Sequence, residues 1–378
     1  MDLQTHVASR TTPDSRPVDL ATLAQRRSTP AQEPPGKASV TLLDVAVGEE
    51  AEPRLIRDAG RVRLVADVGV DGLDVEQPFP GARLTMVPPG EAGGRQGASD
   101  LEGFRPAGVG TAFIASPVAP THQGPRSDGE VSRTIFGIDD RFLFHDTSFP
   151  WRTTGKVRTA GGWGSGTMIG RRHVLTASHV VNWDRDAAGD IGWVTFTPGY
   201  YDGRGPWGEL AVDEVLAWDE VSGSLSDQET AFDYVVLVLR DAIGDTTGFA
   251  GYRTYDPAWN GGDFWQYVGY PGELAGGERP AYQGNVVVST KQDFTLTLDG
   301  TVLNGSVLGH FDDFTPGQSG GAAWGWFGED PWPSVIGVGS TIGSTATQPP
   351  HGSTNGDNEF GGGPALSQLI GWARANRP

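Results

Sequence analysis

The sequence contains no cysteine among its 378 residues. This absence excludes disulfide bonds, catalysis by a thiol, and zinc or iron–sulfur sites built from cysteine. It leaves the cellular compartment open, because a cysteine-free protein tolerates both reducing and oxidising surroundings. Long hydrophobic runs are also missing. The longest apolar run, residues 234–239, is far shorter than the roughly 20 residues of a membrane-spanning helix, so we expect no membrane span. The first residues also lack the basic start and apolar stretch of a secretory signal.

Positive charge is scarce. Lys and Arg number 28 against 47 Asp and Glu, which gives a formal net charge of −19. Such a charge argues against nucleic acid or an anionic membrane surface as the main partner. No basic segment with interleaved aromatic residues opposes that conclusion.

The residues that are abundant indicate a folded β protein. Hydrophobic residues make up 37% of the chain and aromatic residues 10%, which is enough for a substantial core. The chain also has 56 glycines and 27 prolines, and its apolar runs are short. Short β-branched and aromatic runs separated by Gly, Pro, Asn and Asp are typical of strands and turns. The composition therefore favours the all-β class.

The composition divides the chain into two parts. Residues 1–36 are rich in Pro, Arg, Ser, Thr and Gln, and we expect a disordered leader there. Strand-like runs at 40–43 and 62–68 predict a small β-rich part within 38–86, and residues 87–133 have the composition of a linker. We expect residues 1–133 to be a largely irregular leader or pro-segment, followed by one folded domain over 134–378. This segment would be removed or displaced on maturation, and the bond after Arg133 is one candidate cleavage point.

Within 134–378 the pattern predicts many strands and one helix. Leu366, Leu369, Ile370 and Ala373 recur at helical spacing, so we expect a C-terminal helix over 364–376. Many short strands with one terminal helix suit two packed antiparallel β-barrels, the first over about 134–245 and the second over about 246–363. The strands are expected at 174–176, 194–196, 234–239, 266–268, 285–289, 294–298 and 334–338.

Three short segments carry the residue types that a serine nucleophile requires. His179 follows an apolar run, Asp233 directly precedes the run 234–239, and Ser319 lies in the turn Gly-Gln-Ser-Gly-Gly, residues 317–321. A hydroxyl nucleophile needs an imidazole to take its proton and a buried carboxylate to orient that imidazole. The backbone N–H groups of Gly317 and Ser319 could form an oxyanion hole, a pair of donors for the negative oxygen of the intermediate.

The order His179, Asp233, Ser319, with these neighbours, resembles that of the chymotrypsin-fold (trypsin-like) serine endopeptidases. The stretch Ile-Phe-Gly-Ile-Asp-Asp-Arg at 135–141, the Phe-Pro-Trp-Arg at 149–152 and the Gly-Tyr-Pro-Gly at 269–272 are similar to the bacterial glutamyl-endopeptidase-like branch. The resemblance covers roughly 134–378.

This resemblance implies a secreted serine endopeptidase, made as a zymogen, that hydrolyses protein or peptide substrates without a metal or organic cofactor. His179 would be the general base, Asp233 its orienting partner and Ser319 the nucleophile. Ser340 would lie near the buried Asp233. Residues 337–341 would be the strand that pairs with the substrate backbone, so Gly339, Ser340 and Thr341 would bind substrate together with Asp313 and Phe314.

The sequence departs from the family at several positions. Many members have Asp directly before the nucleophile, paired with a newly exposed N-terminal amine, whereas this chain has the neutral Gln318. Glutamate-selective members carry a His at the position of Gly339 and a small hydroxyl residue at the position of Phe314, so a preference for glutamate is not supported. Asp313 lies where an acidic residue selects Arg or Lys in trypsin-like members; alternatively, Asp312 and Asp313 form a solvated loop.

Other interpretations remain open beside this one. A protease fold without catalysis could act as a binding protein, and the pattern Gly-x-Ser-x-Gly at 317–321 also fits the nucleophile turn of α/β-hydrolase esterases. The esterase reading requires a long helix after the serine, which the glycines at 325 and 328 oppose. Asp227 and Asp241 are the alternative acids. His310 is expected to be a surface loop residue, and neither His173 nor His351 has a supporting context.

Overall fold

The computed structural model describes residues 16–29, 54–58, 61–65, 79–92, 100–118, 135–136, 139–187, 189–342 and 357–378. The chain forms two compact units, one of residues 1–31 and 79–378 and a smaller one of residues 32–78. The smaller unit contains the antiparallel pair β1 (Arg54–Asp58) and β2 (Arg61–Val65). The strand expected at 40–43 and the cleavage point after Arg133 lie outside the described residues.

One of the two β regions of the larger unit is a closed barrel. The strands of a seven-stranded sheet run in the order β11-β8-β7-β6-β9-β10-β3, and pairing of β11 with β10 closes six of them, all antiparallel, into a ring. Val157, Val174, Phe196, Val215 and Leu237 fill its interior. The ring consists of β6 (Thr154–Thr159), β7 (Gly162–Met168), β8 (His173–Thr176), β9 (Val194–Pro198), β10 (Leu210–Ala217) and β11 (Val235–Leu239).

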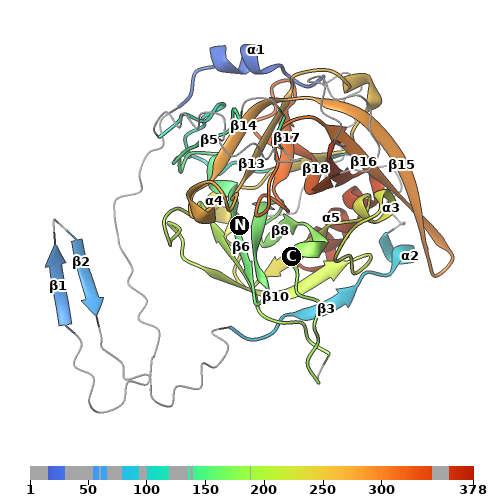
Figure 1. The fold of residues 1–378 in the computed structure, drawn as a ribbon, viewed down its shortest axis with the longest axis horizontal. Coiled ribbons are helices and arrows are strands. Elements are labelled where there is room, and N and C mark those ends of the chain that lie inside the picture. The colour runs from blue at the N-terminus through green and yellow to red at the C-terminus, as the bar shows by residue number, and fades with distance from the viewer. Residues whose placement is uncertain are drawn as a thin grey trace, which may run out of the picture. The chain divides into compact units, whose positions relative to one another are not determined.

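The second β region is a ten-stranded sheet. Its main path runs β15-β16-β19-β18-β17-β13-β14-β5, and β12 (Gly251–Arg253) pairs with β18 and with β4 (Asp100–Leu101). Figure 1 shows the labelled strands of this sheet, among them β13, β14 and β17, beside the barrel strands β6, β8 and β10. The other members are β5 (Phe142–Leu143), β13 (Trp265–Gly269), β14 (Ala281–Val286), β15 (Val288–Leu298), β16 (Thr301–His310), β17 (Ala322–Trp326), β18 (Pro333–Ile342) and β19 (Asn358–Gly362).

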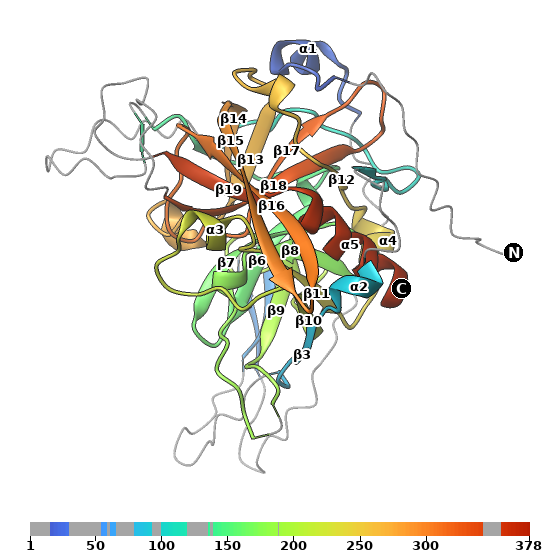
Figure 2. The same cartoon turned by 90° about the vertical axis from the view of Figure 1, so that its right-hand side faces the viewer.

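The C-terminal helix α5 (Pro364–Asn376) has the bounds that the sequence pattern predicts. Proline at its first position lacks only an N–H that would have no partner there. Leu366, Leu369, Ile370 and Ala373 are fully buried, as their helical spacing indicates. Figure 2 shows α5 beside β16 and β11.

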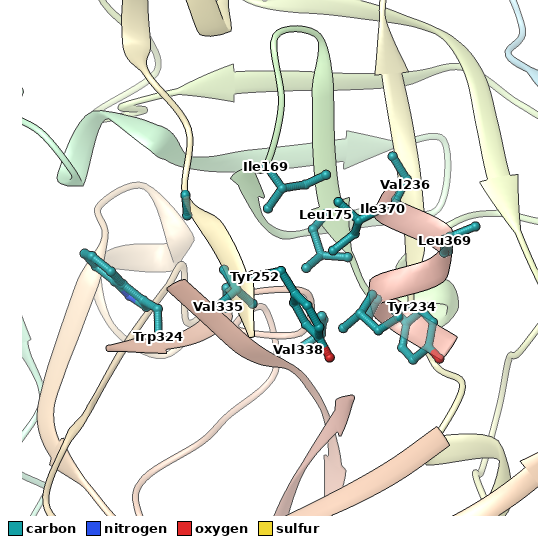
Figure 3. Close-up of a cluster of buried hydrophobic side chains, with 14 of the residues drawn as sticks. Ile169, Leu175, Tyr234, Val236, Tyr252, Trp324, Val335, Val338, Leu369 and Ile370 are labelled. Carbon is teal, nitrogen blue, oxygen red and sulfur yellow. The ribbon is translucent and has the colours of Figure 1, made fainter. Parts of the chain in front are cut away.

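The main hydrophobic core lies where the barrel, the second sheet and α5 meet. Leu175 and Val236 come from the barrel, Tyr252 and Val338 from the second sheet, and Ile370 from α5 (Figure 3). The predicted all-β fold with a C-terminal helix is therefore confirmed. Short helices and 3-10 turns complete the unit: α1 (Leu20–Gln25), α2 (Pro89–Ala92), α3 (Asp227–Thr230), α4 (Gly244–Thr247), η2 (Trp151–Thr153), η3 (Ser178–Val180), η4 (Pro257–Trp259) and η5 (Ala275–Gly277).

Described segments from the N-terminal third of the chain belong to the larger unit. Strand β3 (Arg83–Met86) pairs in parallel with β10 and extends the barrel sheet. Leu23 of α1 is fully buried in a cluster with Phe149 and Trp326. Among the described residues, no helix combines the length and hydrophobicity that crossing a membrane requires.

Candidate active site

His179 lies just after a buried barrel strand. Strand β8 ends at Thr176, and the 3-10 turn η3 holds His179 as its middle residue. The apolar residues of β8 are buried in the cores, so they fix the position at which the turn begins. The His179 side chain remains 24% exposed, and its imidazole is therefore accessible from solvent.

Asp233 lies between α3 and β11 and is fully buried. Its carboxylate accepts the backbone N–H of His179 at 2.9 Å and lies 2.6 Å from Nδ1 of the same residue. The Ser340 hydroxyl on β18 donates to the same carboxylate. A buried carboxylate is stable only when hydrogen bonds and a paired charge compensate for the lost water. Three donors meet that need here, and two of them belong to His179.

The contact with Asp233 determines the protonation of His179. Burial lowers the pKa of the His179 imidazole, but the charge of Asp233 and its hydrogen bond raise it more, so the pKa lies above its ordinary value. In the neutral ring, Nδ1–H donates to Asp233, and Nε2 is then the acceptor nitrogen. The arrangement thus supplies a base whose basicity exceeds that of a free imidazole.

Ser319 lies in a tight turn between β16 and β17. Gly317 and Gly320 adopt φ values of +96° and +85°, which L-residues with side chains rarely adopt. A Cβ at Gly320 would lie only 2.2 Å from the carbonyl oxygen of Ser165 and from Oγ1 of Thr176. Both the backbone angles and the lack of space therefore require glycine at this position.

Ser165 on β7 fixes this turn to the barrel. Its N–H donates to the Ser319 carbonyl at 2.7 Å, and its hydroxyl donates to the Gly317 carbonyl at 2.8 Å. The same hydroxyl accepts the N–H of Tyr270 at 2.9 Å. Ser165 is fully buried and was not assigned a role from the sequence. Its only sequence signal is the small Gly-Ser-Gly run, which permits this close approach of backbones.

The backbone around Ser319 leaves two N–H groups available. The N–H groups of Gly317 and Ser319 donate to no residue that the structure describes. In a planar trans peptide, the N–H points away from the preceding carbonyl. The Pro316 carbonyl accepts the N–H of Gly272 at 2.9 Å, and the Gln318 carbonyl accepts the N–H of Gly321 at 2.9 Å. Both carbonyls therefore point into the protein, and the N–H groups of Gly317 and Ser319 point the opposite way.

A cavity of about 660 Å³ joins most of the predicted site residues. His179, Gly317, Ser319, Ser340 and Thr341 all line it, although they come from both β regions of the fold. The other lining residues are Thr159, Gly161, Gly162, Trp163, Val180, Val181, Asn182, Phe314 and Pro316. The cavity thus lies at the contact of the barrel with the second sheet.

Two residues predicted to bind substrate do not line this cavity. Gly339 lies on β18, where a Cβ would be 2.2 Å from the Tyr267 hydroxyl. Asp313 is buried, and its carboxylate accepts the N–H groups of Phe136 at 2.9 Å and Asp140 at 3.3 Å. The interpretation of Asp313 as part of a solvated loop is therefore wrong. Burial raises the pKa of the Asp313 carboxyl to about 7.

The other histidines that the structure describes do not line this cavity. His310, expected on the surface, is instead fully buried at the end of β16, where its ring stacks on Phe360 with a centroid separation of 4.0 Å. That expectation was wrong because the last residues of β16 face the core rather than a loop. His173 is buried in β8, and burial lowers the pKa of its imidazole to about 3. His351 lies outside the described residues.

Comparison with known proteins finds two curated relatives, whereas no family model matches. Glutamyl endopeptidase of Bacillus licheniformis is 26% identical over 168 residues, which are 44% of this chain and 51% of the relative. An extracellular metalloprotease of Bacillus subtilis is 30% identical over 131 residues, 32% of this chain and 39% of the relative. The chain spans about half the length of these relatives or less. Within the described part of this chain, no cluster of three or more His, Cys, Asp or Glu side chains could hold a metal ion.

Solved structures with a similar chain trace include a Glu endopeptidase in complex with MPD, with a TM-score of 0.48 and 19% identity. That match covers 64% of this chain and all of the other. A thermostable serine protease, AL20, matches with a TM-score of 0.41 and 16% identity over 60% of this chain and 98% of the other. The resemblance indicated by the sequence motifs is confirmed by the curated relative: this chain is similar to the glutamyl-endopeptidase-like branch of the trypsin-like serine proteases.

Proposed function

We propose that this protein is a serine endopeptidase in which Ser319 is the nucleophile, His179 the general base and Asp233 the residue that orients His179. The observation that carries the proposal is the contact of 2.6 Å between His179 Nδ1 and the buried Asp233 carboxylate, with Ser319 lining the same cavity as His179. An imidazole oriented by a carboxylate and facing a hydroxyl is the arrangement that activates a serine.

The mechanism follows from these atoms. Ser319 Oγ attacks the carbonyl carbon of the peptide bond, and its proton passes to Nε2 of His179. The N–H groups of Gly317 and Ser319 stabilise the negative oxygen of the tetrahedral intermediate. His179 then gives the proton to the leaving amine, which leaves an ester on Ser319. Water, deprotonated by His179, hydrolyses this ester and restores the serine.

The proposal includes no preference for glutamate before the cleaved bond. The name of the Bacillus licheniformis relative describes that protein. At the two positions where glutamate-selective members carry a His and a small hydroxyl residue, this chain has Gly339 and Phe314. Among the residues that line the cavity, His179 is the only one with an ionisable side chain near neutral pH. Asp313 directs its carboxylate toward backbone N–H groups and not into the cavity, so it gives no support to Arg or Lys selection.

Secretion and maturation are parts of this proposal that rest on resemblance. The name of the Bacillus subtilis relative places that protein outside the cell. For maturation we propose that any cleavage after Arg133 leaves the described N-terminal segments attached without a covalent link. The support is that β3 adds to the barrel sheet and that α1 contributes Leu23 to a buried cluster.

Labelling with a fluorophosphonate tests the proposed function, because this reagent labels an activated serine hydroxyl far faster than an ordinary one. The experiment compares the full chain with Ser319→Ala and with Ser224→Ala, a control at an exposed loop serine. We expect labelling of the full chain and of Ser224→Ala, and none of Ser319→Ala. If the folded full chain is not labelled, the proposal fails and a binding role for the protease fold becomes the better account.

A further inference from the structure

We propose that Arg141 is a positioning residue for the turn that carries Ser319, acting through the side chain of Gln318. This inference rests on the proposed function, since it concerns how the nucleophile and the oxyanion hole are held. In many trypsin-like proteases, the residue before the nucleophile is an Asp that pairs with a newly exposed N-terminal amine. Here the side chain of an internal arginine would supply the positive charge instead.

The contacts of Arg141 converge on the turn before Ser319. The guanidinium is almost completely buried, with 1% of its side chain exposed. Its Nη1 donates to Oγ1 of Thr315 at 2.8 Å and to Oε1 of Gln318 at 2.5 Å. Gln318 is fully buried and directly precedes Ser319. A planar guanidinium bound to two residues of one short turn restricts that turn more than a single contact would.

Two carboxylates compensate for the buried charge of Arg141. Asp139 and Glu273 each lie 2.8 Å from Nη2. Their charges and hydrogen bonds raise the pKa of the Arg141 guanidinium despite its burial, so the group stays charged. A neutral amide at position 318 can accept from Arg141 without adding a third carboxylate to this buried group. The replacement of the family's Asp by Gln318 is consistent with an arginine that already has two acidic partners.

Gln318 links Arg141 to the chemistry through its own peptide group. Its side-chain Oε1 also accepts the N–H of Thr315 at 3.0 Å, which closes the turn. Its backbone carbonyl accepts hydrogen bonds from the buried Tyr267 hydroxyl and from the N–H of Gly321. The next N–H in the chain is that of Ser319, which lies in the same peptide plane. Because the side chain and the backbone carbonyl of Gln318 are both held, the direction of the Ser319 N–H, one of the two proposed oxyanion donors, is fixed as well.

The same segment is held at a second point. The carboxylate of Asp313 accepts the N–H groups of Phe136 and Asp140, so the two chain segments also contact each other just before Arg141. The cation comes from a side chain within the chain, so no newly exposed amine is needed to order the turn. We therefore expect the uncleaved chain to have a competent oxyanion hole.

The test uses Arg141→Met, Gln318→Met and the double variant in the full chain, with steady-state kinetics on a peptide substrate. Arg171→Met is the matched control, because Arg171 makes a comparable two-bond contact with Asp245 on the exposed surface. Misplacing an oxyanion donor reduces transition-state stabilisation more than substrate binding. We expect kcat to fall about 10- to 100-fold in each single variant, with KM changed less than about threefold.

The double variant identifies the route of the effect. If Arg141 acts through Gln318, the double variant has about the same kcat as Arg141→Met alone. The control retains wild-type kcat and KM. Unchanged kcat in Gln318→Met, or a rise in KM at constant kcat, overturns the inference. If Arg141→Met does not fold, as judged by its thermal unfolding, Gln318→Met decides alone because it removes no charge. Failure of the proposed function is distinguishable, because then the wild-type chain itself has no activity.

Discussion

Replacing Asp233 with asparagine changes one atom of a fully buried side chain and tests the role proposed for His179. The carboxylate accepts the N–H groups of His179 and the Ser340 hydroxyl, so every contact requires an acceptor. The amide of asparagine can offer its N–H₂ group to Nδ1 of His179. The imidazole would then carry its proton on Nε2, the nitrogen that must accept the proton of Ser319.

The expected loss follows from this change of tautomer. A Ser-His-Asp triad loses about 10⁴-fold in kcat when its carboxylate becomes an amide. At about 1.36 kcal/mol for each tenfold, this corresponds to roughly 5.5 kcal/mol of transition-state stabilisation. KM should change little, because Asp233 lies beneath His179 and does not line the cavity. The measurement is kcat and KM on a peptide substrate for the wild-type chain and Asp233→Asn.

The pH profile supplies an independent check. The charge of Asp233 raises the pKa of His179 above its ordinary value of about 6.5, and catalysis requires the neutral imidazole. Activity of the wild-type chain should therefore rise with pH through a midpoint above 6.5, and the midpoint should be lower in Asp233→Asn.

Two alternative acids provide the controls for this experiment. Asp227→Asn and Asp241→Asn should stay within about twofold of wild-type kcat, because both lie at or near the surface. A loss below tenfold in Asp233→Asn, or a large loss in Asp227→Asn instead, would refute the assignment.

Three further predictions concern the N-terminal segments, acid stability and specificity. Leu23→Ala should lower the free energy of unfolding by about 2–4 kcal/mol, because Leu23 is fully buried beside Trp326; chemical denaturation measures this, and an unchanged midpoint would contradict it. Burial raises the pKa of Glu214, but hydrogen bonds, chiefly from Arg377, lower it more, to about 2. The stability that the Glu214 carboxylate contributes is therefore present above about pH 4.5 and is lost as the pH falls toward 2. Glu214→Gln should be less stable than wild type at pH 7, with a difference that shrinks in acid. Asp313→Asn should leave the preferred residue before the cleaved bond unchanged in a peptide-library digest, because its carboxylate does not line the cavity.

Local patterns were sufficient to predict the fold class and to single out most of the residues that meet at the candidate site. The apolar face of Leu366 and Ile370 predicted α5, because a helix that buries one face repeats its apolar residues at a fixed spacing. Glycine on both sides of Ser319 indicated a tight turn, and in the structure Gly317 and Gly320 of this turn adopt positive φ. These features depend on residues close together in the sequence, where pattern and structure are directly related.

Contacts between distant segments could not be predicted in this way. Arg141 and Gln318 lie 177 positions apart, and no spacing in the sequence relates them. The parallel pairing of β3 with β10 joins residues such as Arg83 and Glu214, and a strand pattern does not specify its partner. The sequence pattern predicted strands at 285–289 and 294–298, whereas β14 ends at Val286 and β15 runs over Val288–Leu298. The polar stretch 290–293 interrupts the apolar alternation, although its backbone pairs with β16. Such features depend on the whole fold.

The most direct measurement of the central proposal is detection of the acyl intermediate on Ser319. The full chain would be mixed rapidly with an activated ester of a short peptide, quenched in acid, and digested for mass spectrometry. We predict a burst of product close to one equivalent, an acyl group on the peptide that contains Ser319, and disappearance of that group as turnover completes. Turnover without an acylated peptide, or acylation of another residue that persists in Ser319→Ala, would contradict the account.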